Sequence, residues 1–122
     1  MKVALALLLS LAAAAAAPAT AEGFSTQYVT GFDSTTACKK DAYRALVAHE
    51  KEYGRRPETI TASFSVVAFD LSPGATDLVV VCAAAGDVVI ATVAGHSAEE
   101  DGTRLATVEA IKERLLMIGP AR

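Results

Sequence analysis

The sequence has 122 residues, 52% of them hydrophobic, and carries 11 Lys and Arg against 14 Asp and Glu, for a formal net charge of −3. This weak acidity disfavours nucleic acids as partners, because its two basic pairs, Lys39-Lys40 and Arg55-Arg56, are short and flanked by acids, as in solvated surface. The length fits one domain with one hydrophobic core.

The first 21 residues have the parts of a secretory signal peptide. Lys2 supplies a positive charge, residues 3–11 form an uncharged apolar run, and Ala19-Thr20-Ala21 has the A-x-A form of a cleavage site. A retained membrane anchor is the alternative, but the strongly apolar part is shorter than the roughly 20 residues that a spanning helix needs. We therefore expect cleavage of residues 1–21, a single exported α+β domain over residues 22–122, a periplasmic or secreted location, and no stable membrane anchor after cleavage.

Two cysteines, Cys38 and Cys82, follow this leader. Export places them where disulfides persist, and they do not form a C-x-x-C pair. The sequence therefore predicts one structural disulfide between them, in preference to a redox-active pair or a zinc site.

The first predicted elements are a strand and a helix. Alternating side chains over residues 24–32 predict the strand. The polar run over residues 33–36 offers several helix N-caps, and the helix is predicted to continue to about Tyr53, with Gly54 at its left-handed stop. The apolar residues of this helix are spaced by three and four, as on a buried face: Cys38, Ala42, Ala45, Leu46, His49 and Tyr53.

Three further strands are predicted next. Residues 60–69 alternate as a half-buried strand, and residues 70–77 are dense in turn formers, which predicts a surface loop. Residues 78–84 and 88–94 are two β-prone runs. Their short connection, Ala85-Gly86-Asp87, predicts a tight hairpin.

A second helix is predicted at the end of the chain. Ser97 and Glu100 have the spacing of a capping box, so the helix is expected to start at Ser97 and to end at Gly119-Pro120. Its predicted apolar stripe is Leu105, Val108, Ile111, Leu115 and Ile118.

The order β-α-β-β-β-α predicts an α+β fold. We expect a two-layer sandwich, with a four-stranded, mainly antiparallel sheet, the first strand at an edge, and two helices on one face. Cys38 and Cys82 both face the core in this arrangement. Their disulfide would staple the first helix to the third strand, close a loop of about 45 residues and contribute on the order of 4 kcal/mol.

Only two histidines, His49 and His96, could supply imidazole chemistry. His49 lies on the inner helical stripe, which is typical of a structural histidine bonded to the backbone or to Tyr53. His96 is predicted in the loop before the last helix, where the acids of residues 99–101 could bind a cation weakly but lack a recognisable ligand spacing. The sequence has no phosphate loop, dinucleotide fingerprint or nucleophile elbow. It therefore predicts no catalytic residue, metal site or cofactor.

The strands also predict an apolar second sheet face, on the side opposite Cys82. Such a face is typical of burial against another copy, a partner protein or an apolar ligand. We expect a non-enzymatic protein-interaction or structural module of the cell envelope, with a second copy or an envelope protein as partner. The alternative is a small periplasmic or secreted enzyme, or an apolar-ligand carrier, that uses His49, His96 or Asp70. The residues predicted on the second face are Val79, Val81, Val89, Ala91 and Val93.

Overall fold

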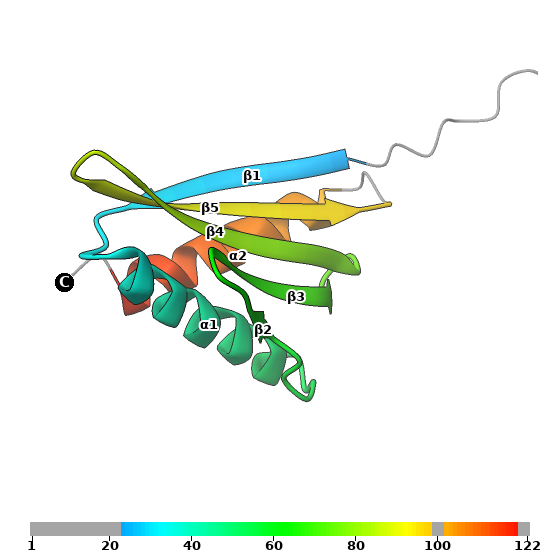
Figure 1. Cartoon of the computed structure of the whole chain (residues 1–122). Helices are drawn as coiled ribbons and strands as arrows, with labels where there is room; N and C mark the ends of the chain where they lie inside the picture. Colours follow the sequence, from blue (N-terminus) through cyan, green and yellow to red (C-terminus); the bar gives the residue numbers. More distant parts are fainter. Residues whose placement is uncertain (1–22, 99–101, 120–122) are drawn as a thin grey trace, which may run out of the picture.

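The computed structural model describes residues 23–98 and 102–119, which form a sheet with two helices packed on it (Figure 1). The strands are antiparallel throughout, in the order β1-β5-β4-β3-β2. Figure 1 shows α1 and α2 on the same side of the sheet. The predicted two-layer α+β sandwich is therefore confirmed, with its first strand at an edge. The elements are β1 (Gly23–Thr30), α1 (Thr35–Glu52), β2 (Ile60–Thr61), β3 (Ser65–Leu71), β4 (Thr76–Ala85), β5 (Val88–Ser97) and α2 (Thr103–Ile118).

The sheet has five strands instead of the predicted four, because residues 60–69 form two strands with a turn between them. The Ala62 N–H donates to the Ser65 carbonyl at 2.8 Å in this turn. Lys39 of α1 donates to the carbonyls of Ala62 and Ser63. The turn contains no Gly, Pro, Asn or Asp, so the sequence carries no turn signal there.

The first helix follows its predicted boundaries. Ser34 is the N-cap, and its side-chain oxygen accepts the Ala37 N–H at 3.0 Å. Gly54 adopts a φ of +71°, as predicted for the stop after the helix. The predicted buried stripe ends at His49, because Tyr53 is 48% exposed at the C-cap of the helix, with its ring 4.8 Å from the His49 ring. Tyr53 was thus wrongly predicted to lie on the inner face.

The predicted hairpin is present between β4 and β5. Ala85 pairs with Val88, which leaves Gly86 and Asp87 as a two-residue turn. Gly86 has a φ of +60°, the conformation that such turns require and that glycine adopts without strain.

The predicted capping box at the start of the second helix is wrong. Ser97 is the last residue of β5 and is buried, while α2 begins at Thr103 after Gly102. The strand extends this far because β5 pairs with neighbours on both sides, with Gly23 of β1 opposite Ser97. Glu100, the other half of the box, lies outside the described residues.

The inward stripe of α2 starts with an arginine instead of Leu105, which is 42% exposed. Arg104 is buried and donates to the Ser97 carbonyl at 3.1 Å and to the Ser25 hydroxyl at 3.2 Å. At Gly95 the helix and β5 come so close that a Cβ atom would lie 2.6 Å from Val108. The other predicted stripe residues pack inward: Val108, Ile111 and Leu115 are fully buried, and Ile118 is partly buried.

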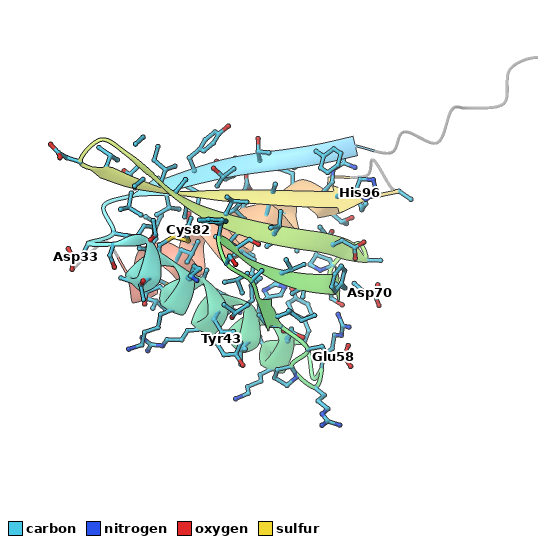
Figure 2. The ribbon with its side chains drawn as sticks, viewed as in Figure 1. Asp33, Tyr43, Glu58, Asp70, Cys82 and His96 are labelled. Atoms are coloured by element: carbon cyan, nitrogen blue, oxygen red, sulfur yellow. A yellow bond between two sulfur atoms is a disulfide. The ribbon has the colours of Figure 1, made fainter. Side chains whose placement is uncertain are left out.

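The disulfide joins the helical layer to the centre of the sheet. Cys38 of α1 and Cys82 of β4 are bonded, with their Cα atoms 6.0 Å apart (Figure 2). Both residues are fully buried. The predicted bridge and its position between helix and strand are confirmed.

Candidate functional site

The side of the sheet that faces away from α1 and α2 is a continuous, mostly apolar surface, which we call the open face. No described element covers it (Figure 1). It is made of the outward side chains of all five strands: Phe24, Thr26, Tyr28 and Thr30 of β1, Ile60 of β2, Ser65, Val67 and Phe69 of β3, Asp77, Val79, Val81, Ala83 and Ala85 of β4, and Val88, Ile90, Thr92, Ala94 and His96 of β5.

Large side chains lie at the two margins of the open face, and small ones lie between them. Phe24 and Tyr28 on the β1 margin are 75% and 62% exposed, and Ile60 and Phe69 on the opposite margin are 56% and 53% exposed. Val81, on the central strand, is 37% exposed. The uncovered face of an antiparallel sheet is commonly polar, so this distribution indicates a contact surface.

The open face carries one charged side chain, Asp77, at its end. The Asp77 carboxylate accepts the Asp70 N–H at 2.9 Å, which ties β4 to the bulged end of β3. Interface cores are depleted of charge and enriched in Tyr and Phe, because desolvating an unpaired charge is costly. The open face matches this pattern in its nearly uncharged centre, but its aromatic side chains lie at the margins.

Three of the residues predicted on this face lie in the core instead: Val89, Ala91 and Val93. The two-residue turn pairs Cys82 with Ala91. Directly opposite residues of two paired strands point to the same side of the sheet, so Ala91 and its alternate neighbours face the helices with Cys82. The outward positions of β5 belong to Ile90, Thr92 and Ala94. The prediction for Val79 and Val81 is confirmed.

His96 lies at one end of the open face, on β5, and not in a loop as the sequence predicted (Figure 2). Its ring is 4.9 Å from the Phe24 ring of β1, and its register partner on β4 is Asp77. The acids of residues 99–101, which the sequence suggested as companions, lie outside the described residues. His96 is therefore part of the open face, beside an aromatic ring.

His49 lies on the other side of the sheet, fully buried on the inward side of α1. Its Nε2 atom donates to the Ser72 carbonyl at 2.6 Å, and its ring is 4.8 Å from the Tyr53 ring. From the other helix, the Thr107 hydroxyl donates to the Pro73 carbonyl at 2.6 Å. Both helices thus hold the connection between β3 and β4, which gives His49 the structural role that its position on the helix suggested.

Burial lowers the pKa of His49 below its usual value of about 6.5. The bond to the Ser72 carbonyl favours the charged ring, the charge of Arg114 opposes it, and Glu50 favours it, but desolvation is the largest effect. The Nδ1 atom is buried and has no hydrogen-bond partner among the described residues. The ring is therefore neutral at pH 7.

The carboxylate of Glu50, which the sequence did not single out, is buried beside His49. It accepts the Glu58 N–H at 2.7 Å and the Thr59 hydroxyl. These bonds fix the connector between α1 and β2, so the carboxylate is used for structure.

The residues of the alternative active site lie on two sides of the sheet, although His96 and Asp70 are both neighbours of Asp77. His49 lies beneath the sheet, His96 lies on the open face, and Asp70 is exposed at the end of β3. Its backbone N–H is bonded to Asp77 and its carbonyl accepts from Arg55. This arrangement does not assemble a nucleophile, base and orienting acid around one point.

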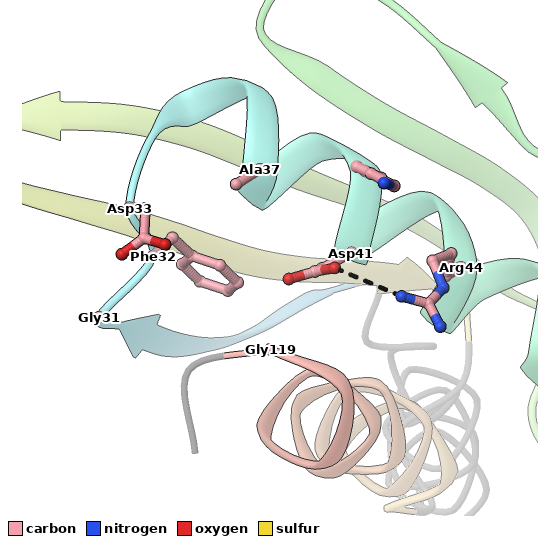
Figure 3. A pocket seen from close by; sticks show the side chains of 8 residues that line it. Gly31, Phe32, Asp33, Ala37, Asp41, Arg44 and Gly119 are labelled. Carbon is pink, nitrogen blue, oxygen red and sulfur yellow. Dashed lines mark ion pairs between the residues drawn. The ribbon is translucent and has the colours of Figure 1, made fainter. Parts of the chain in front are cut away.

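A polar hollow of about 350 Å³ lies between the start of α1 and the end of α2 (Figure 3). Asp41 and Arg44, neighbours on α1, form an ion pair at 3.9 Å on one side of it, and Asp33 and Lys40 add one charge of each sign. The charges in the hollow are balanced, so it does not select for an anion or a cation.

A shallower hollow of about 490 Å³ lies along α1, beside β2. Tyr43 lies among Lys39, Lys40 and Arg44 there. The Lys39 amine is already bonded to the turn between β2 and β3. The prediction of a solvated first basic pair therefore holds for Lys40, which is exposed, but not for Lys39, which is partly buried and bonded to this turn.

Residues 23–98 and 102–119 contain neither a cluster of metal ligands nor a membrane-spanning helix. No group of three or more His, Cys, Asp or Glu side chains is placed to hold a metal ion. No helix in these ranges is long and apolar enough to cross a membrane.

Comparison of the chain with protein-family models, curated proteins and solved structures finds no match. The open face is therefore the candidate functional site on its own geometry.

Proposed function

We propose that this chain is a small exported protein that acts as a non-enzymatic interaction module and binds another protein through the open face. The observation that carries the proposal is the exposure of Phe24, Tyr28 and Phe69 around an uncharged sheet centre. Exposing these apolar side chains to water costs free energy, and a partner that covers them removes that cost.

The free energy available from burying the aromatic rings supports a contact over the whole open face instead of over the rings alone. The three exposed rings offer roughly 350 Å² of apolar surface, worth about 9 kcal/mol before costs. Association costs about 4–15 kcal/mol in lost freedom of motion. The rings alone therefore outweigh this cost only in the lower half of its range, and a stable complex gains more by also covering the Val and Ala side chains between them.

The export part of the proposal rests on the leader-like first 21 residues and on the disulfide. An intact, fully buried bridge between Cys38 and Cys82 suits an oxidising compartment such as the periplasm or the extracellular space. The non-enzymatic part is supported by the separation of His49 from His96 across the sheet.

Site-specific photocrosslinking in the producing cell tests this function. A benzophenone side chain is placed at Tyr28 on the open face and, as a matched control, at Tyr53, the C-cap of α1. Tyr28 is 62% exposed and Tyr53 is 48% exposed. We expect discrete protein adducts from position 28 only. We also expect Val81→Glu, at the centre of the face, to abolish them. Equal adducts from both positions, or none from position 28, would contradict the proposal.

A further inference from the structure

We infer that the partner that covers the open face is a second copy of this chain, packed sheet against sheet. This inference rests on the proposed function and names its partner. It predicts a symmetric dimer with two sheets in the middle and a helical layer on each outside.

The area of the face is suited to such a dimer. The strands have 8, 2, 7, 10 and 10 residues in chain order, and each strand residue covers roughly 3.3 by 4.8 Å of sheet. The sheet therefore presents roughly 600 Å² before the relief of the side chains is counted. Stable interfaces bury about 800 Å² on each partner, so nearly all of the open face must take part.

The width of the face favours a sheet over a helix as the occupant. Five strands spaced about 4.8 Å apart span roughly 24 Å, whereas a helix with its side chains is about 10–12 Å across. One helix would cover the small side chains of the centre and leave one of the aromatic margins in water. A second five-stranded sheet covers both margins.

The shape of a twisted sheet makes a second copy the best-fitting sheet. Strands twist with one hand, so a sheet has the form of a saddle. Turning that saddle over about an axis along its strands gives the same saddle, and two copies can therefore stack at a constant separation of about 10 Å. The two-fold axis produces a closed dimer with the same patch on both sides.

The charge distribution allows this self-contact. A two-fold dimer brings residues that lie close to its axis near their own copies, so a charged centre would repel itself. The central residues Val79 and Val81 are uncharged, and the single acid on the face, Asp77, is exposed at the end of β4. Self-association therefore buries no like-charge pair at the centre, and the two copies of Asp77 lie at the rim, where water and salt screen their repulsion.

Sedimentation equilibrium of the protein, purified with its disulfide intact, tests the inference. Val81→Glu places a charge at the centre of the face. Leu105→Glu places the same charge on α2, at a residue of similar exposure, 42% against 37%. We expect a concentration-dependent dimer for the wild type and for Leu105→Glu, and at least a roughly 100-fold weaker dimer for Val81→Glu. Tyr28→Ser, a milder change on the exposed margin, should weaken the dimer by roughly 10-fold even if Val81→Glu folds poorly.

A wild-type protein that stays monomeric up to about 100 µM would overturn the inference. If position 28 still gave adducts with a different protein, the proposed function would stand without the dimer. A dimer that both Val81→Glu and Tyr28→Ser leave unchanged would also overturn the inference, because its interface would lie elsewhere, as in pairing of β1 edges. If the dimer inference were overturned and position 28 also gave no adducts, the proposed function would be wrong too.

Discussion

The two faces of the sheet are made of similar residues but have opposite environments. On β4, Val80 is fully buried under the helices, while its neighbour Val81 is 37% exposed on the open face. The core face is covered by apolar side chains of α1 and α2, including Leu46, Ile111 and Leu115. An apolar strand face is typical of burial, but the chain's own helices cover only one of the two faces.

The covered face is fixed covalently, so breaking the disulfide should give the largest change in stability. The bridge closes a loop over a sequence separation of 44 residues, which constrains the unfolded chain by about 4 kcal/mol. We expect reduction, or the double variant Cys38→Ala/Cys82→Ala, to lower the melting temperature by roughly 15–25 °C. Melting followed by circular dichroism measures this. An unchanged melting temperature in both cases would show that the bridge does not stabilise the helical layer on the sheet.

A Val→Ala substitution on each face should change the free energy of unfolding less than loss of the disulfide does, and it compares the two faces directly. In dilute protein, Val80→Ala leaves a cavity in the core and should cost about 2.5 kcal/mol, whereas Val81→Ala should cost less than about 1 kcal/mol. Urea unfolding of both variants measures the difference. At concentrations where the open face is in contact, the cost of Val81→Ala should rise. Equal costs in dilute protein would mean that the two faces are equally buried.

His49 should couple folding to pH, with the smallest effect of the three. Burial lowers the folded-state pKa of His49, so below about pH 6.5 the unfolded state binds the proton more readily. Stability should therefore be complete above pH 6.5 and fall as the pH drops toward the folded-state pKa. His49→Gln should flatten this part of the profile. Denaturant unfolding at pH 7.5 and 5.5 is the check, and an identical slope in the wild type and His49→Gln would contradict it.

Most of the fold could be predicted because the local signals agree with the tertiary contacts. Ser34 and Gly54 mark both ends of α1, and Gly86 marks the hairpin. Where the prediction failed, a long-range contact overrode a local signal. Pairing with Gly23 keeps Ser97 in β5 despite its capping pattern. Arg104 faces inward, where the predicted apolar stripe had Leu105, because its side chain is bonded to Ser25 and Ser97.

The candidate site could be predicted only in part, because which residues share a face depends on the register of the hairpin. Cys82 faces the helices, which correctly put Val79 and Val81 on the open face. The two-residue turn sets Ala91 beside Cys82, so the β5 half of the predicted face was inverted. The alternation of Phe24 and Tyr28 was visible in the sequence, but the side they share was fixed only by the pairing of β1 with β5.

Oxidative footprinting of the tyrosines is the most direct test of the claim that the open face is a contact surface. The chain has three tyrosines: Tyr28 lies on the open face, Tyr43 lies on α1, and Tyr53 is the C-cap of α1. Hydroxyl-radical labelling in intact producing cells is compared with labelling of the dilute purified protein. The account predicts that Tyr28 becomes several-fold less reactive in cells while the two helical tyrosines do not change. Equal reactivity of Tyr28 in both conditions, with the helical tyrosines as reference, would contradict it.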